Sequence, residues 1–329
     1  MADNLAAGMR TAAAALLERL TDAQRAAAAV PFADEGARRW IEYRPAPRPG
    51  ACLADLDQAA RKAAHRLLAT GTSRHAYAQA MAVVALEEVL DRVEGGTRGR
   101  HSGDYWVSVF GDPHGDAPWS WRFEGHHVSV SMLVAGAEVS PAPVFLGANP
   151  ARVGYGGRTV SRPLAPEEDL GHALLEAAGP RGRAAAIVSG EAPPDVLSAT
   201  RAQAPARIEP LGAAASTLPP GARALLDQLV ALYLERLPPE LAAREAARIG
   251  GGERHFAWAG QTLHGRPHYY RIQGDDLLIE FDQTTGDGNH AHSVLRRPRG
   301  DFGEDVLARH RATAHDGRSA GATTPSRSG

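Results

Sequence analysis

The spacing of apolar side chains separates a helical N-terminal part of the chain from a strand-rich remainder. Over residues 1–96 apolar residues recur every three or four positions, as at Met9, Leu16 and Leu20. This is the period of a helix that buries one face and exposes the other. The pattern therefore predicts a helical N-terminal lobe that packs on the rest of the protein.

From about residue 105 the period falls to two, which is typical of strands with one buried face. Strands are expected at residues 40–44, 106–110, 119–123, 128–132, 184–188, 255–259, 268–273 and 277–282. Later helices are expected at residues 167–178 and 225–237, from the proline pair at 238–239 onward, and at 306–311. The predicted fold class is α+β: an antiparallel sheet core with the N-terminal helical lobe and additional covering helices.

These elements predict a single α+β domain over residues 1–315, whose sheet-rich core spans residues 97–315. A loop-rich insert at 191–220, with many alanines and prolines, is expected to be a long surface loop or an internal linker. Residues 316–329 are rich in Gly, Ser and Thr and are expected to form a disordered tail. The sequence shows no internal repeat, phosphate-binding loop or nucleophile elbow.

The apolar face changes phase within the first predicted sheet segment, at Gly125. Apolar residues occupy odd positions before this glycine and even positions after it. Since a continuous strand cannot keep one apolar face through such a shift, a bulge or a tight turn is expected here. With a bulge, Arg122, Glu124 and His127 share the polar face and His126 lies at the bulge itself. The alternative is a hairpin corner whose histidines hydrogen-bond the backbone.

Composition and charge narrow the classes of function. The 329-residue chain has a net charge of −2 and 43% hydrophobic residues, which allows a buried core and provides no field that would attract nucleic acid. No apolar run is long enough to predict a membrane span. Cys52 is the only cysteine, which excludes an intrachain disulfide and a cysteine zinc site. A cytoplasmic protein is expected. Its oligomeric state stays open, with a homodimer through the alanine-rich N-terminal helices as one alternative.

Histidines gather in two segments that can supply metal ligands. His290 and His292 are two residues apart, so in an extended chain both imidazoles lie on one face. The upstream pair His126 and His127 and the strand carboxylate Glu280 can complete the ligand set. Two imidazoles, one carboxylate and open positions are typical of catalytic zinc or non-haem iron, and three imidazoles also suit copper. The sequence predicts a divalent transition metal (iron, copper or zinc) with these five residues as candidate ligands.

Candidate catalytic residues come from the predicted strands. His268 and Tyr270 share one face of the strand at 268–273, and Arg271 lies on the other. Tyrosine and arginine beside a metal commonly orient an anionic substrate, which makes these residues and Arg122 the candidates. Packing within the sheet is the alternative for the tyrosine. Seven histidines lack such neighbours and are expected to be structural or exposed: His65, His75, His101, His114, His172, His255 and His315.

The favoured hypothesis is a metal-dependent enzyme acting on a small-molecule substrate. Iron or copper would favour oxygen-dependent oxidation, and zinc would favour hydrolysis through a bound hydroxide; oxidation is preferred because tryptophan- and tyrosine-rich walls suit an enclosed apolar pocket. One alternative is a metal-free hydrolase in which a His/Glu network provides acid–base catalysis. The other is a protein that binds a small ligand without catalysis. No nucleic-acid or membrane partner is expected.

Several sequence blocks together resemble the DUF3500 family of proteins of unknown function. The blocks occur between about Met9 and His310 and lie at residues 119–127, 143–150, 256–260, 268–274, 279–282, 289–294 and 300–305. The resemblance implies a shared fold and a shared polar centre, without an established reaction. This chain departs from the family pattern at Leu295, where tryptophan is usual, and near Arg297, where an acidic residue is usual. The histidine pair at 290 and 292 is kept.

Overall fold

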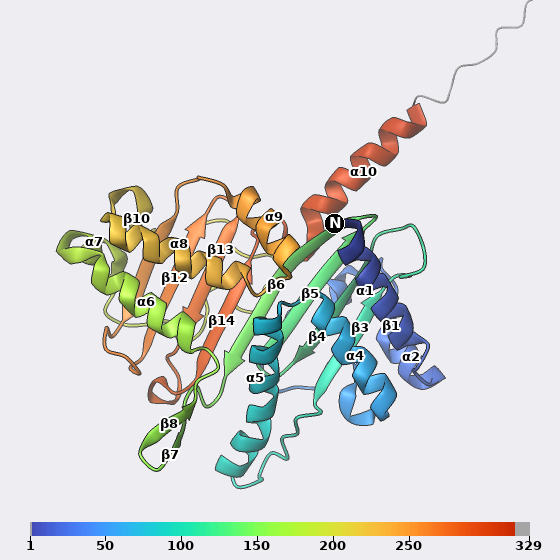
Figure 1. Ribbon diagram of the computed structural model, residues 1–329, viewed down its shortest axis with the longest axis horizontal. Coiled ribbons are helices and arrows are strands. Elements are labelled where there is room, and N and C mark those ends of the chain that lie inside the picture. Colours follow the sequence, from blue (N-terminus) through green and yellow to red (C-terminus); the bar gives the residue numbers. More distant parts are fainter. Residues whose placement is uncertain (1, 320–329) are drawn as a thin grey trace, which may run out of the picture.

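In the computed structural model, which describes residues 2–319, helices pack along one large mixed sheet of twelve strands (Figure 1). A separate two-stranded sheet forms a small hairpin at its side. Helices and strands both make up a substantial part of the chain, so the predicted α+β class is confirmed. No helix among residues 2–319 is long and apolar enough to cross a membrane.

The N-terminal half of the chain begins with the predicted helical lobe and ends with four long strands. Its helices are α1 (Ala2–Leu17), α2 (Asp22–Ala28), α3 (Glu35–Arg38), α4 (Gln58–Thr70) and α5 (Arg74–Val93). Its strands are β1 (Ala29–Val30), β2 (Ala51–Cys52), β3 (Tyr105–Phe110), β4 (Trp119–Gly125), β5 (Val128–Ala135) and β6 (Glu138–Ala148).

The C-terminal half follows the hairpin of β7 (Val153–Tyr155) and β8 (Arg158–Ser161). Its helices are α6 (Ala165–Ala177), α7 (Gly179–Ala186), α8 (Pro220–Leu234), α9 (Pro239–Ile249) and α10 (Glu304–Ser319). Its strands are β9 (Ile187–Ser189), β10 (Ala213–Ala214), β11 (His255–Gly260), β12 (His268–Gly274), β13 (Leu277–Asp282) and β14 (Ala291–Arg296).

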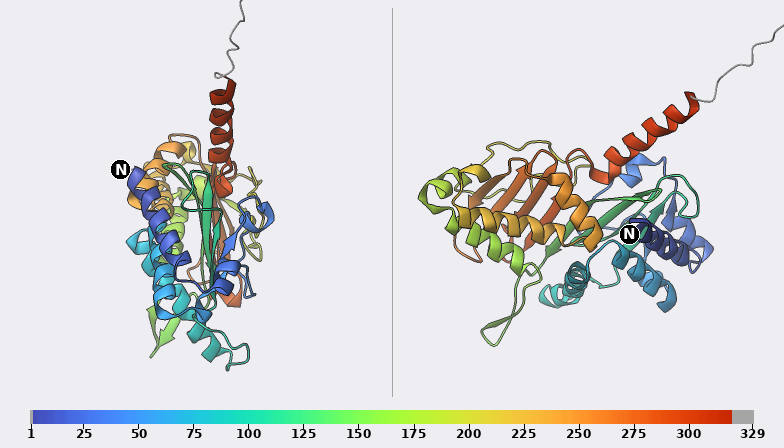
Figure 2. Two further views of the ribbon diagram at one scale, coloured as in Figure 1. Left: turned by 90° about the vertical axis from the view of Figure 1, so that its right-hand side faces the viewer. Right: turned by 45° about the horizontal axis from the view of Figure 1, so that its top comes forward.

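The two halves meet at the centre of the sheet, where β6 and β14 pair in antiparallel fashion. The main path of the sheet runs β1-β3-β4-β5-β6-β14-β13-β12-β11-β10. Helices of both halves lie against the same face, as the edge-on view in Figure 2 shows. Segments without long helices, residues 31–50 and 190–212, cover the opposite face. Each half therefore contributes one set of helices and one covering segment.

The halves repeat the same order of elements. In each, two helices lead to a short edge strand, a covering segment, a second short strand, a turn of 3-10 helix and two further helices. A meander of four antiparallel strands then follows. The edge strands also agree, because β1 pairs in parallel with β3 and β9 pairs in parallel with β11. The protein is built from two structurally equivalent units, although no repeat is evident in its sequence.

Strand register shows that the equivalence holds residue by residue across the first three strands of each meander. In the N-terminal half, three side chains lie opposite one another on successive strands: Val109, Trp121 and Met132. Their counterparts, each 149 positions later, lie opposite one another in the same way: Trp258, Tyr270 and Phe281. The repeat is hidden in the sequence because equivalent positions keep their direction in the sheet while their residue types differ.

Glycine occupies two equivalent positions at which the backbone has no room for a side chain. Gly50 and Gly212 precede the second short strand of each half, and both have positive φ, 123° and 87°. A Cβ on Gly50 would lie 2.7 Å from the carbonyl oxygen of Val107, and one on Gly212 would overlap the carbonyl of Phe256. Both sites thus require a residue without a side chain, because the conformation and the space each exclude one.

The main hydrophobic core lies between the sheet and the helices. Large side chains from both meanders are fully buried there, among them Trp121, Phe123, Tyr270 and Phe281. Each such side chain contributes about 1.5–3 kcal/mol through removal of apolar surface from water. A smaller cluster on the opposite face joins the covering segments to the central strands: Ile41, Tyr43, Phe145, Val196, Val294 and Phe302. This second cluster borders the candidate site.

Two of the expected strands do not form as predicted, and two further segments are placed by the structure. Residues 40–44 form no strand, and residues 184–186 end α7, with only residues 187–189 extended. Residues 191–212 of the expected insert form most of the second covering segment, and β10 and α8 follow it. Residues 316–319 of the predicted disordered tail continue α10. The rest of that tail, 320–329, lies outside the described residues.

Candidate metal centre

The turn between β4 and β5 sets the position of the first histidine. β4 ends at Gly125, which pairs with Val128 at the start of β5, so His126 and His127 are the two turn residues. His127 adopts a φ of 63°, the left-handed conformation that tight hairpin turns use. Its N–H donates to the carbonyl of Tyr43. The phase shift predicted at Gly125 is therefore produced by the tight-turn alternative.

Gly147 on β6 leaves the room that the His127 ring fills. Its N–H donates to the carbonyl of His127, and it pairs with His292 on β14. A Cβ at this position would lie 2.7 Å from Cδ2 of His127 and 2.9 Å from the carbonyl oxygen of Ala291. Both distances are inside van der Waals contact, so glycine lets the turn approach the central strands.

The alternation of β14 directs two further imidazoles to the same point. His290 lies immediately before this strand and His292 within it. The Nε2 atom of His127 is 2.8 Å from Nε2 of His290 and 3.2 Å from Nε2 of His292, and the last two atoms are 3.0 Å apart. The two histidine segments identified in the sequence therefore converge, with three ring nitrogens around one point.

These distances match the spacing of ligands around a single metal ion. Ring nitrogens that bind a metal at about 2.0–2.1 Å lie about 2.9 Å apart at right angles and about 3.4 Å apart in a tetrahedron. The observed separations of 2.8–3.2 Å are nearer to the right-angled, facial arrangement. Such a set leaves several positions free for other ligands.

Burial keeps the imidazoles of His127 and His290 uncharged. Burial, followed by the neighbouring histidines, lowers the pKa of His127 well below its ordinary value. Burial, and then the charge of His292, lower the pKa of His290 to about 3. A neutral imidazole presents a lone pair, and converging lone pairs repel one another unless a cation lies between them. The cluster is therefore suited to a positively charged ion.

Asp195 and Tyr43 hold His292 in the orientation that a metal ligand needs. Nδ1 of His292 is 2.8 Å from Oδ1 of Asp195, and the Tyr43 hydroxyl donates to Oδ2 at 2.7 Å. Burial alone would raise the pKa of Asp195, but its contacts with His292 and Tyr43 outweigh burial and lower it. With the Nδ1 proton directed at the carboxylate, the Nε2 lone pair faces the cluster, as in carboxylate–histidine–metal sites.

Asp282 is a second carboxyl group behind His292. It lies opposite His292 on β13, with Oδ2 3.8 Å from Nδ1 of that ring. Burial raises the pKa of Asp282 to about 7, despite a hydrogen bond from the Thr284 hydroxyl. Both carboxyl groups thus lie on the Nδ1 side of the ring, away from the three converging nitrogens.

His126 lies beside the cluster and has its own partners. Its ring stacks on that of His127, with centroids 3.7 Å apart. Its Nδ1 contacts the carboxylate of Glu87 on α5. His126 is not one of the three converging nitrogens; together with Glu87 and His127 it forms an adjoining group that could also hold a metal ion. A pocket of about 380 Å³ adjoins His126 and is also lined by Arg48, Arg100 and Trp106.

Glu280, another predicted ligand, lies outside the cluster. Its carboxylate accepts hydrogen bonds from the N–H groups of Leu197 and Ser198 and from the Tyr269 hydroxyl. These bonds fasten the covering segment that carries Asp195. Glu280 therefore acts on the cluster only through the position of Asp195.

The two predicted catalytic arginines also fasten covering segments. Arg122 donates to the carbonyl of Ala37 at 2.8 Å, and Arg271 donates to the carbonyl of Ile208 at 3.2 Å. These arginines are equivalent positions of the two halves, 149 residues apart, and both are buried. The structure gives both of them the same architectural contact and places neither at the cluster.

Tyr270 and His268, the other predicted catalytic residues, lie on the helix-covered face of the sheet. The Tyr270 hydroxyl donates to the carbonyl of Glu167. His268 stacks on Trp258 with an interplanar angle of 3°. Tyr270 therefore packs within the sheet, as the alternative interpretation of the sequence had it. Neither Tyr270 nor His268 belongs to the candidate metal groups that contain His127, His290 or His292.

Sequence reasoning missed Asp195 and Tyr43. Asp195 lies in the segment 191–220, whose alanine and proline content indicated a loop and drew no attention to its only aspartate. Tyr43 lies in residues 40–44, which were expected to form a short strand, and nothing in that pattern pointed to a histidine partner. Neither residue carries a local signal, because each reaches His292 through a covering segment of a different half.

Comparisons with known proteins show the family of this chain and leave its activity open. No curated protein and no solved structure matches the chain. Residues 2–304, nearly all of the described part, match the family described as "Protein of unknown function (DUF3500)". Every block that carried the resemblance falls within this match, except for the last residue of the final block. The chain therefore belongs to the DUF3500 family.

Proposed function

We propose that this protein is a metal-dependent enzyme acting on a small molecule, with His127, His290 and His292 as the metal ligands. The observation that carries the proposal is the convergence of three Nε2 atoms within 2.8–3.2 Å of one another. The contact of Asp195 with the far side of His292 supports it, because outer carboxylates of this kind orient ligating imidazoles.

We propose oxygen-dependent oxidation as the reaction class, with iron or copper as the metal. Three imidazoles suit both ions, and a facial set leaves open positions at which a substrate and dioxygen can bind together. A zinc hydrolase with three histidines would favour the wider tetrahedral spacing. The rings of Tyr43 and Phe145, stacked at 4.0 Å, provide an apolar wall beside His292. The pocket next to His126 provides space for a small molecule.

Metal analysis of the full chain tests the proposal. Chelator-treated protein is incubated separately with Fe²⁺, Cu²⁺ and Zn²⁺, and the retained metal is measured after desalting. Oxygen uptake is then followed with a panel of small organic substrates. We expect wild-type protein to retain iron or copper at the centre and His127→Ala to lose one equivalent. The control His75→Ala removes an exposed histidine outside the candidate groups and should match the wild type.

Two results would overturn the proposal. Wild-type protein without a stoichiometric transition metal would remove its basis. Equal metal content in wild type and His127→Ala, with both proteins folded, would show that the converging nitrogens are not the ligands. Binding of zinc alone, without oxygen uptake under any condition, would reject the oxidation chemistry while keeping the metal centre.

A metal-free hydrolase is the second candidate, favoured by the contact between His292 and Asp195. A histidine held by a carboxylate at Nδ1 can act as a general base through Nε2. Here the carboxylate is Asp195, in place of the glutamate expected from the sequence. The two candidates differ in one simple property, since hydrolysis of this kind survives exhaustive chelation and the metal-dependent reaction does not.

We also propose that the enzyme works in the cytoplasm, as its single cysteine suggests. Fractionation of cells that produce the protein would test this, and recovery outside the cytoplasm would contradict it.

A further inference from the structure

A second group of imidazole and carboxylate side chains lies on the helix-covered side of the C-terminal half. Glu168 and His172 are four residues apart on α6 and so share one face of this helix. His264 lies in the loop between β11 and β12. One ligand atom from each of the three residues lies within 4.8 Å of the others. None of the three was singled out as a metal ligand from the sequence, and His172 was expected to be structural or exposed.

The imidazole of His172 is buried and lacks a polar partner at one nitrogen. The residue is only 6% exposed, and its Nε2 has no hydrogen-bond partner within residues 2–319. Burial, then the charges of His268 and His264, lower its pKa to about 3, which leaves the ring neutral. The His264 ring stacks on it at 3.8 Å and is largely exposed. A buried ring nitrogen without a partner destabilises the folded protein, and a cation bound at its lone pair removes this cost.

His268 adds a second unpartnered nitrogen to the same environment. Its Nδ1 lies 2.8 Å from the carbonyl of Arg266, so the proton resides on Nδ1 and the lone pair on Nε2. That Nε2 is buried and has no partner in the described part of the chain. The ring centroids of His268 and His172 are 4.7 Å apart. His268 thus borders the group in a protonation state that suits a nearby cation.

Charge near Glu168 also favours a cation. Arg162 donates to Glu168 at 2.8 Å and to Asp169 at 2.6 Å, so one guanidinium faces two carboxylates. The other Glu168 oxygen accepts hydrogen bonds from the N–H of Gly265 and from Gln283. These contacts orient the carboxylate and leave one net negative charge beside the neutral imidazoles of His172 and His268.

The N-terminal half serves as an internal control for this group. Ala29 of β1 and Ile187 of β9 occupy equivalent positions, since each pairs with the equivalent residue of the meander. Counting back along the preceding helices from these two residues makes Arg10 the equivalent of Glu168, and Ala14 the equivalent of His172. Buried residues follow the same correspondence, as at positions 16 and 174 and at 28 and 186.

The equivalent helix in the N-terminal half holds its loop without any imidazole. Arg10 donates to the carbonyls of Pro113 and Gly115, which lie between β3 and β4. In the N-terminal half, a single arginine is therefore enough to attach the loop between β3 and β4 to its helix. The carboxylate and imidazoles of the other half are not required by the architecture, and their convergence calls for a separate explanation.

We infer that Glu168, His172 and His264 form a second metal site, distinct from the three-histidine centre, that binds a zinc-type divalent cation. Two imidazoles and one carboxylate are an established zinc ligand set, with water as a further ligand. His264 brings the loop at 261–267 to α6, so the cation fastens this loop where Arg10 fastens its counterpart. The exposed His264 gives the ion a path from solvent.

Zinc titration of the full chain tests this site separately from the first. After chelator treatment, the protein is titrated with Zn²⁺ by calorimetry, and bound zinc is counted after desalting. His264→Ala and His172→Gln should each lose about one equivalent relative to wild type. His264 is largely exposed, so its replacement leaves the core intact. Combined with His127→Ala, the loss should be additive, because the two sites share no residue.

The matched control is His114→Ala, which removes an exposed histidine from the equivalent loop between β3 and β4. It should bind as much zinc as the wild type. Hydrogen exchange provides a second readout: zinc should slow exchange in residues 261–267 of the wild type and leave His264→Ala unchanged. Full zinc stoichiometry in both His264→Ala and His172→Gln would overturn the inference. Loss in His127→Ala alone would support only the first centre.

Discussion

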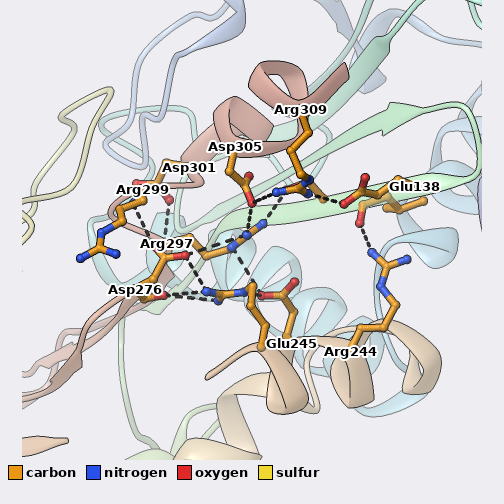
Figure 3. A network of polar contacts seen from close by, with 12 residues as sticks. Glu138, Arg244, Glu245, Asp276, Arg297, Arg299, Asp301, Asp305 and Arg309 are labelled. Atoms are coloured by element: carbon orange, nitrogen blue, oxygen red, sulfur yellow. Dashed lines mark hydrogen bonds and ion pairs between the residues drawn. The ribbon is translucent and has the colours of Figure 1, made fainter. Parts of the chain in front are cut away.

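The two ends of the central strand pair carry equivalent turns with opposite chemistry. At one end His127, from the β4–β5 turn, meets two further imidazoles. At the other end its counterpart 149 positions later, Asp276 of the β12–β13 turn, enters a network of arginines and carboxylates (Figure 3). Asp276 accepts hydrogen bonds from Arg248 and from the N–H of Arg299, and Arg297 lies 4.0 Å away.

The two ends differ in whether their polar groups already have partners of opposite charge. In the network, Arg297 alone pairs with Asp305 at 2.6 Å and Glu245 at 3.4 Å, so positive and negative groups neutralise each other. In the histidine cluster, three imidazole nitrogens face one another, and the carboxyl groups of Asp195 and Asp282 lie on the far side of His292. The network stabilises the attachment of α10 and α9 to the sheet, whereas the cluster favours an added cation.

Replacement of a cluster histidine should have the largest effect on metal binding. His292→Ala removes one ligand and the link to Asp195, and we expect the affinity for iron or copper to fall more than about a hundredfold, beyond the usual effect of an outer partner. Asp276→Ala, a change in the equivalent turn at the other end of the central strand pair, should leave metal binding unchanged. Equilibrium metal competition measures both. Similar losses in the two variants would show that the two ends do not differ as described.

Removal of the central arginine should produce the largest loss of stability. Arg297→Ala removes the buried partner of Glu245 and Asp305, which keep only the less buried Arg248 and Arg309, and we expect the free energy of unfolding to fall by about 1–3 kcal/mol. Metal affinity of the folded protein should stay at the wild-type value, because the network lies at the far end of β14. Urea denaturation and metal competition measure the two quantities. Reduced affinity with unchanged stability would contradict the assignment.

A methyl group at Gly147 should disturb the cluster through geometry alone. Gly147→Ala places a Cβ 2.7 Å from the His127 ring, which must move away from the other two imidazoles. We expect metal affinity to fall about a hundredfold, comparable to the strongest effects of outer partners. The control Gly221→Ala adds a methyl group where no atom lies within 4 Å and should have no effect. Unchanged affinity in Gly147→Ala would mean that the His127 ring is not fixed by this contact.

The carboxylate behind the cluster should have a more moderate influence. Asp195→Asn keeps the shape of the side chain while removing the charge that orients His292, and we expect about a tenfold loss of metal affinity. Tyr43→Phe, which removes only the hydroxyl bonded to Asp195, should lose less. Metal competition again provides the measurement. A larger loss in Tyr43→Phe than in Asp195→Asn would contradict this order.

The smallest predicted effect is a pH dependence of stability in metal-free protein. The folded protein holds the pKa of His290 at about 3, while the unfolded chain binds a proton near pH 6.5. The unfolded state therefore gains protons first, and this contribution to stability is lost as the pH falls below about 6.5.

Between pH 6.5 and 5.5 the loss should be about 1 kcal/mol. His290→Gln should show a shallower dependence, as measured by urea denaturation at several pH values. Parallel curves for wild type and variant would remove the electrostatic explanation of the neutral cluster.

Much of the fold could be predicted because its signals are local. The period of two located β3, β4, β5, β11, β12 and β13, and the shift of phase at Gly125 located the turn that carries His127. The short edge strands were not predicted, since two or three residues contain no measurable period. Arg122 and Arg271 were assigned to the site because their chemistry suited it, whereas their carbonyl partners could be known only from the covering segments.

The sequence by itself determined which faces of the strands are apolar, and that His290 and His292 point the same way, because alternation follows from the geometry of an extended backbone. Only the tertiary structure decided that His127, 163 residues earlier, meets them, and that Asp195 and Tyr43 stand behind His292. The pairing of β6 with β14 and the docking of two covering segments produce these contacts. Such long-range choices depend on the packing of the whole molecule and leave no periodic trace in any one segment.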